Sequence, residues 1–164
     1  MCKLILEHYR FIKKMNDMSI EELGQYIYGV NPSIYSAFKN NELKCAKNII
    51  SDYLSIIKSS LNIIKHSIQR SEKETKAALT RVEKIIKALY INKKQSPISE
   101  IEEELGINKS HFCRYHIGAL KYFAAIFNKV AQRKGYPNAL SNIDTRILAI
   151  MRLDKQAKTV KQSA

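Results

Sequence analysis

Apolar residues recur at helical spacing near the start of the chain. In segment 3–16 the spacing is set by Leu4, Ile5, Tyr9, Ile12 and Met15. Asn16 and Asp17 end this pattern, and the tetrapeptide SIEE at 19–22 follows. It has the form of a capping box, because its hydroxyl can accept the N3 amide while its last carboxylate reaches back. Two helices are therefore predicted here, the second of them short.

A further helix is predicted over PSIYSAFKN, residues 32–40. Asn31 is a favoured N-cap, and Pro32 at the first helical position loses only an amide that would be unpaired anyway. The pair Asn40-Asn41 is the predicted end of this helix.

The longest apolar stripe lies between Leu43 and Lys93, where neither glycine nor proline occurs. Its first part consists of Ile50, Leu54, Ile57, Leu61, Ile64 and Ile68. Steps that alternate between four and three residues are typical of a coiled-coil seam. The pattern predicts either an intramolecular bundle or a homodimer seam formed by these six residues. The stretch SEKETK, 71–76, is the least apolar, so either one rod or a helical hairpin is compatible with it.

The segment ISEIEEELGINKSHFCRYHI, 98–117, has the pattern of a helix, a glycine turn and a second helix. Gly106 suits the turn, which needs a positive φ, and Asn108 can cap the second helix. The predicted inward residues are Ile101, Leu105, Ile107, Phe112 and Tyr115. The predicted outward residues are Lys109, Ser110, Cys113, Arg114 and Ile117.

The rest of the chain supplies neighbours for this motif. TRVEKIIKALYINKK, 80–94, predicts a preceding helix, and 119–131 is a strongly apolar segment after the motif. A turn is expected at 133–137, and a last helix at 142–153. The predicted organisation is an N-terminal unit (1–42), a helical connector or dimerisation segment (43–79), a C-terminal domain (80–153) and a basic tail (154–164). The fold class expected is all-α.

Charge and composition narrow the class of partner. Lysine and arginine outnumber aspartate and glutamate by 28 to 15, which leaves a net charge of +13 and favours a polyanion such as nucleic acid. Three scattered cysteines without a CxxC pair fit a reducing compartment. No segment has the form of a signal peptide or of a transmembrane helix. A cytoplasmic, nucleoid-associated protein without a membrane partner is expected.

Neither an enzyme nor a metal protein is indicated. Of His111, Cys113 and His116, only Cys113 and His116 would lie close to one face of a helix, and no fourth ligand is nearby. The glutamates at 100 and 102–104 are typical of a solvated helix face, and no nucleophile–base pair or phosphate loop occurs. No catalytic residue, metal or cofactor is therefore expected.

On these residues, segment 80–124 resembles the helix-turn-helix superfamily of DNA-binding transcription regulators. The match departs at Glu102, where such proteins commonly carry a small residue. Segment 3–41 resembles the same superfamily more weakly, with an extra residue around Tyr28-Gly29. Its outward face would contain Asn31, Ser33, Ser36, Ala37 and Lys39, of which the four polar residues are the candidates for DNA binding.

The resemblance implies a regulator that binds double-stranded DNA and that can contact RNA polymerase or another protein. It would act as a homodimer if the apolar stripe pairs two chains. Arg114 would pair with guanine, while Lys109 and Ser110 would contact base edges or phosphate. Two alternatives stay open. One is a helical adaptor that binds a partner through the stripe at 50–89, and the other is a replication, partition or conjugation factor of a mobile element.

Overall fold

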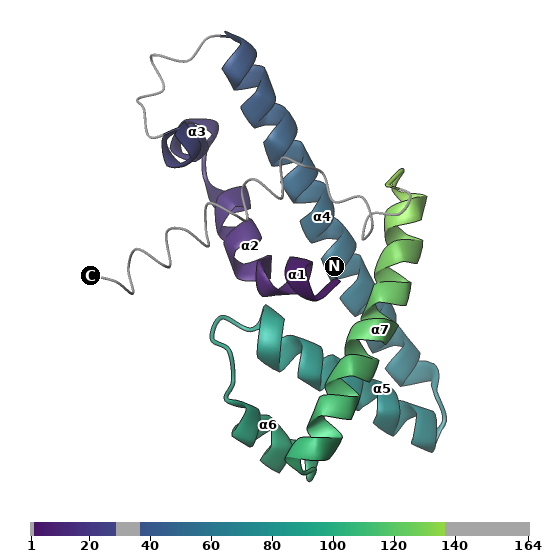
Figure 1. Ribbon diagram of the computed structural model, residues 1–164. Helices are drawn as coiled ribbons and strands as arrows, with labels where there is room; N and C mark the ends of the chain where they lie inside the picture. Colours follow the sequence, from purple (N-terminus) through teal and green to yellow (C-terminus); the bar gives the residue numbers. More distant parts are fainter. Residues whose placement is uncertain (1, 29–36, 137–164) are drawn as a thin grey trace, which may run out of the picture. The chain divides into compact units, whose positions relative to one another are not determined.

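The computed structural model describes residues 2–28 and 37–136, and it confirms the all-α prediction (Figure 1). Within these residues every regular element is a helix. The elements are α1 (Cys2–Glu7), α2 (Tyr9–Asp17), α3 (Ile20–Tyr28), α4 (Ala37–Arg70), α5 (Lys73–Ile86), the π-helix η2 (Lys87–Ile91), α6 (Ile98–Leu105) and α7 (Lys109–Arg133). None of the described helices has the length and apolar character needed to cross a membrane.

The chain divides into two compact units. The first comprises residues 1–10 and 55–141, and the second comprises 11–54 and 142–164. The division falls inside α2 and α4, so both helices contribute residues to each unit.

In the second unit, the capping box at the start of α3 is confirmed. The backbone N–H of Ser19 donates to Glu22 Oε2 at 2.7 Å, and the N–H of Glu22 donates to Ser19 Oγ at 3.1 Å. The rings of Phe11 and Tyr26 lie 5.9 Å apart. The buried residues of this unit include Ile12, Met15, Leu23, Leu43, Ile50 and Tyr53.

Two predicted helix limits near the N-terminus are wrong. The segment 3–16 forms two helices that are separated at His8, whose Nδ1 lies 2.9 Å from the Leu4 carbonyl oxygen. Asn40-Asn41 does not end a helix, because α4 runs through it and through the boundary expected after residue 42. Asparagine disfavours a helix by well under 1 kcal/mol, and the burial of Leu43 just beyond the pair outweighs that preference.

The long stripe is divided between two helices. α4 ends at Arg70, and α5 starts at Lys73, within the polar stretch that allowed a break. Ser71 Oγ donates to the Ser67 carbonyl at 2.7 Å, which satisfies a carbonyl in the last turn of α4. Of the six seam residues, Ile50, Leu54, Ile57 and Ile64 are buried, and Leu61 and Ile68 are half-buried. The stripe therefore contributes to the core of the chain itself, as the intramolecular alternative predicts.

The core of the first unit forms where α5 packs against α7. Leu79, Ile85 and Ile86 of α5 are buried. α7 buries Phe112, Ala119, Phe123, Ile126, Phe127, Val130 and Ala131. The motif's second helix and the apolar segment 119–131 therefore form one helix, which runs through Gly118 to Arg133. One interior glycine costs about 1 kcal/mol relative to alanine, which is less than burial of this face contributes.

Candidate nucleic-acid interface and adjoining pocket

The turn between α6 and α7 has the predicted geometry. Gly106 has a φ of 63°, in the left-handed region. Its N–H donates to Glu103 O at 3.1 Å, and the N–H of Ile107 donates to Glu102 O at 3.0 Å. This pair of bonds is a Schellman motif, which satisfies the last carbonyls of α6.

The start of α7 is capped as expected. Asn108 Oδ1 accepts a hydrogen bond from the backbone N–H of His111 at 2.9 Å. The first turn of α7 contains no acidic residue, so nothing within it offsets the positive end of the helix dipole. This helix end therefore favours an anion such as phosphate.

The burial of the side chains follows the predicted inward and outward faces of the motif. Ile101 and Phe112 are 2% and 3% exposed, and Leu105, Ile107 and Tyr115 are half-buried. Asn108 is exposed, as are four of the five predicted outward residues, Lys109, Ser110, Cys113 and Arg114, which we call the outer face of α7. Ile117 follows them and is 55% exposed.

An aromatic ring lies beside Arg114. Its guanidinium carbon is 5.7 Å from the centroid of the Tyr115 ring. Arg81 of α5 stacks more closely on that ring, with its guanidinium carbon 4.1 Å from the centroid. The Tyr115 ring thus contacts arginines from two helices, and its contact with Arg114 favours positions of that side chain near the ring.

The two helices of the motif carry opposite charge. α7 contains five lysines and arginines and no carboxylate, whereas α6 contains four glutamates and no basic residue. Lys84 Nζ lies 2.6 Å from Glu104 Oε1, which offsets one of these charges. Glu102 occupies the position where a small residue is expected, and its Oε1 is buried without a hydrogen-bond donor in the described part of the chain. A glutamate at this position therefore lowers the stability of the fold, because its buried oxygen has lost water without gaining a donor.

The N-terminal candidate residues cannot be placed in the same way. Asn31, Ser33 and Ser36 lie outside the described residues. Lys39 belongs to α4, but its side chain also lies outside them. The predicted last helix, 142–153, and the basic tail are outside them too.

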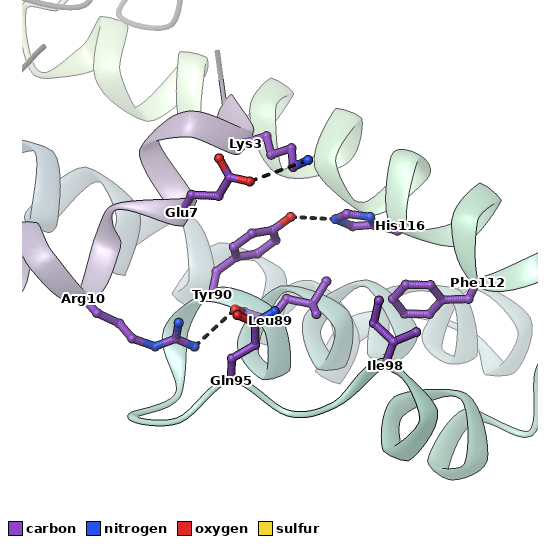
Figure 2. Close-up of a pocket in the computed structure, with 9 residues that line it drawn as sticks. All are labelled: Lys3, Glu7, Arg10, Leu89, Tyr90, Gln95, Ile98, Phe112 and His116. Carbon is purple, nitrogen blue, oxygen red and sulfur yellow. Dashed lines mark hydrogen bonds and ion pairs between the residues drawn. The ribbon is translucent and has the colours of Figure 1, made fainter. Parts of the chain in front are cut away.

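A pocket beside α7 was missed by the sequence patterns. It has a volume of about 240 Å³, and Figure 2 shows its lining residues. They are Lys3, Glu7, Arg10, Leu89, Tyr90, Gln95, Ile98, Phe112 and His116. The sequence carries only a weak signal for this pocket, because its side chains come from two segments far apart in the chain, 3–10 and 89–116, and no local spacing relates them.

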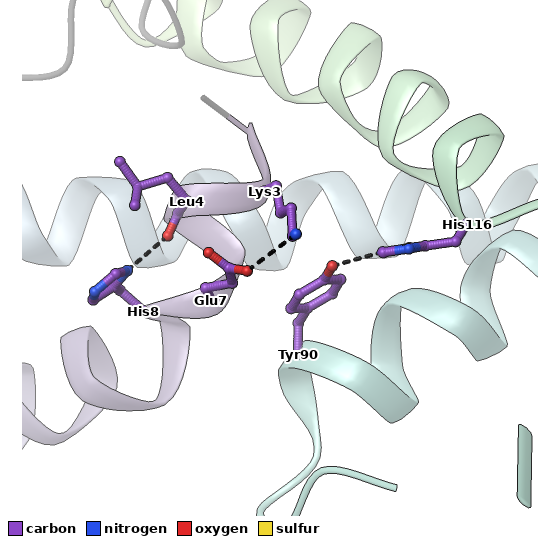
Figure 3. A network of polar contacts seen from close by, with 6 residues as sticks. All are labelled: Lys3, Leu4, Glu7, His8, Tyr90 and His116. Carbon is purple, nitrogen blue, oxygen red and sulfur yellow. Dashed lines mark hydrogen bonds and ion pairs between the residues drawn. The ribbon is translucent and has the colours of Figure 1, made fainter. Parts of the chain in front are cut away.

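The polar side of the pocket is organised by Tyr90 and His116. Tyr90 Oη and His116 Nε2 are hydrogen-bonded at 2.7 Å, and Figure 3 shows the two side chains that make this contact. The His116 ring also stacks on Phe112, with centroids 5.8 Å apart. Burial lowers the pKa of His116 below its ordinary value of 6.5; Lys3 lowers it further, and Glu7 partly opposes the shift. His116 is therefore mainly neutral at pH 7.

Arg10 connects the N-terminal helices to the π-helix. Its Nη2 donates to Leu89 O at 3.1 Å, and its Nε donates to Asn92 O at 2.6 Å. These carbonyls lie at the end of η2, where backbone acceptors lack helical partners. Arg10 thus caps η2 from a position about 80 residues earlier in the chain.

In the described part of the chain, no three His, Cys, Asp or Glu side chains lie close enough together to hold a metal ion. Comparison with family models, with curated proteins and with solved structures returned no match.

Proposed function

We propose that the chain binds double-stranded DNA in a sequence-specific manner through the outer face of α7. One observation carries the proposal: a capped helix N-terminus without acidic residues follows a Schellman turn, and it presents four exposed polar or basic side chains. The net charge of +13 supports it, because a basic surplus favours a polyanionic partner.

Each residue of this face has a suitable chemistry. Arg114 can donate two hydrogen bonds to O6 and N7 of guanine, and its contact with Tyr115 reduces the conformational entropy lost on binding. Lys109 and Ser110 lie in the first turn, where the helix dipole and free amides also favour phosphate. Transcription regulation through occupancy of a promoter is the role we propose for this binding.

The acidic helix α6 restricts the orientation of the DNA. Glu100 and Glu103 are exposed, and their carboxylates would repel phosphates at close range. We expect the duplex to contact the outer face of α7 in an orientation that keeps these glutamates away from its phosphates.

The adaptor alternative has less support. Its binding surface was to be the apolar stripe at 50–89, but Ile57, Ile64, Ile85 and Leu89 are buried within the chain. Dimerisation through the stripe stays a prediction, with Leu61 and Ile68 as the seam residues that keep partial exposure. A role in replication, partition or conjugation would use the same DNA-binding chemistry.

Selection from random DNA duplexes at about 150 mM salt tests the proposal. We expect a preferred motif to be enriched, and Arg114→Ala to weaken binding to it by roughly 1–3 kcal/mol, with little effect on random DNA. Arg133→Ala is the matched control, because this arginine is also exposed on α7 but lies about 28 Å along the helix from Arg114. It should leave the discrimination between the two DNAs unchanged.

Two outcomes would count against the proposal. Equal loss of affinity for selected and random DNA would make Arg114 a phosphate contact without a role in sequence recognition. Failure to enrich any motif would reject sequence-specific binding and favour the adaptor. An enriched palindrome would indicate a dimer.

A further inference from the structure

The pocket beside α7 has a charged side and an apolar side. Lys3 and Glu7 of α1 lie on one side of Tyr90, and Ile98 and Phe112 lie on the other (Figure 2). Leu89 extends the apolar wall, while Arg10 and Gln95 complete the polar lining. Ligand sites commonly combine an apolar wall with a few polar groups that orient the ligand.

The charges in the pocket leave a positive surplus. Lys3 and Arg10 are opposed by Glu7 alone, and His116 is mainly neutral at pH 7. The Lys3–Glu7 pair is long, at 3.5 Å, and the two side chains are 59% and 44% exposed, so their pairing contributes little. A carboxylate that enters the pocket can therefore bind Lys3 without disrupting a strong interaction.

We infer that this pocket binds a small organic monocarboxylate that carries an aromatic or aliphatic group. The carboxylate contacts Lys3 and Arg10, and the apolar group packs against Leu89, Ile98 and Phe112. A volume of about 240 Å³ lies below the usual range for drug-sized ligands, which restricts the occupant to a small molecule. An inorganic anion would leave the apolar wall in contact with water, and a neutral ligand would not use the positive surplus.

The π-helix supports this assignment independently. Single π-helical turns occur frequently at functional sites, and η2 supplies both Leu89 and Tyr90 to the pocket. Arg10 holds the end of η2 through two carbonyls, so the pocket wall is positioned before a ligand arrives.

Calorimetry and NMR of the His116 ring protons can test the inference on the full chain in the absence of DNA. The probes are benzoate, its neutral analogue benzyl alcohol, and inorganic phosphate. We expect benzoate to bind at least tenfold more tightly than either of the others and to shift the His116 signals in a saturable manner. Equal affinity for benzyl alcohol, equal affinity for phosphate, or no saturable binding would each overturn the inference.

Matched lysine variants locate the carboxylate. Lys3→Gln should reduce the affinity for benzoate at least fivefold and should leave that for benzyl alcohol unchanged. Lys13→Gln, an exposed lysine outside the pocket lining, should change neither affinity. Equal effects of the two substitutions would show that benzoate binds elsewhere. Lys3 is exposed, so its replacement should leave the fold intact.

The apolar wall can be tested at Ile98, which is 47% exposed and therefore tolerates replacement. Ile98→Asn should weaken benzoate and benzyl alcohol by a similar factor, and unchanged affinity for both would refute the proposed orientation. The outcome of these measurements does not depend on whether the outer face of α7 binds DNA.

Discussion

Two glycines of the first unit should respond to alanine in opposite directions. Gly106 ends α6 with a φ of 63°, whereas Gly118 lies inside α7 and is not among the glycines with positive φ. A Cβ atom added at either position would meet no other atom within 4 Å. Steric clashes therefore cannot explain a difference between the two substitutions, and the comparison isolates the backbone conformation.

The expected magnitudes follow from that conformation. Gly106→Ala places a Cβ in the left-handed region, which costs about 1–2 kcal/mol of unfolding free energy. Gly118→Ala removes a flexible residue from a helix interior and should raise the unfolding free energy by about 0.5–1 kcal/mol. The two variants should thus differ by roughly 1.5–3 kcal/mol.

Urea unfolding followed by circular dichroism measures both changes against the unsubstituted chain. The slope of the unfolding free energy with urea should be the same for all three proteins, because neither substitution alters the buried surface. Stabilisation by Gly106→Ala would refute the assigned turn. Destabilisation by Gly118→Ala would refute the single continuous helix α7.

Three further predictions concern contacts that hold the helices in place. Arg10→Ala should lower the unfolding free energy by about 1–2 kcal/mol, because Leu89 O and Asn92 O each lose a charged donor. Urea unfolding measures this loss, and Lys13→Ala is the control. A loss no greater than that of the control would contradict the capping role of Arg10. Ser19→Ala should lower the unfolding free energy by about 1 kcal/mol, because the capping box loses its hydroxyl. Urea unfolding measures this change as well. An unchanged urea midpoint would show that water replaces the hydroxyl. His116 has a lowered pKa in the folded state, so the unfolded chain binds its proton more readily and stability should fall as the pH drops below about 6.5. His116→Gln should lose less stability than the unsubstituted chain between pH 7.5 and 5.5, and parallel curves would exclude this contribution.

Local patterns were reliable where a few neighbouring residues set the geometry. The Ser19–Glu22 box, the Gly106 turn and the Asn108 cap were all predicted, because each forms within six residues of sequence. Helix lengths were less reliable. Asn40-Asn41 was predicted as a helix end from intrinsic preference, but that preference is worth only about 1 kcal/mol or less, and burial of apolar neighbours outweighs it.

The sequence by itself determined the all-α class, the division of the motif into an inward and an outward face, and the surplus of positive charge. Periodicity and capping are local, and charge is a sum over residues, so none of them requires knowledge of the fold. Only the tertiary structure decided that the apolar stripe contributes to the chain's own core. It alone brought Lys3 and Arg10 to a pocket beside His116, because contacts between residues about 100 positions apart depend on how helices pack and leave no periodic trace.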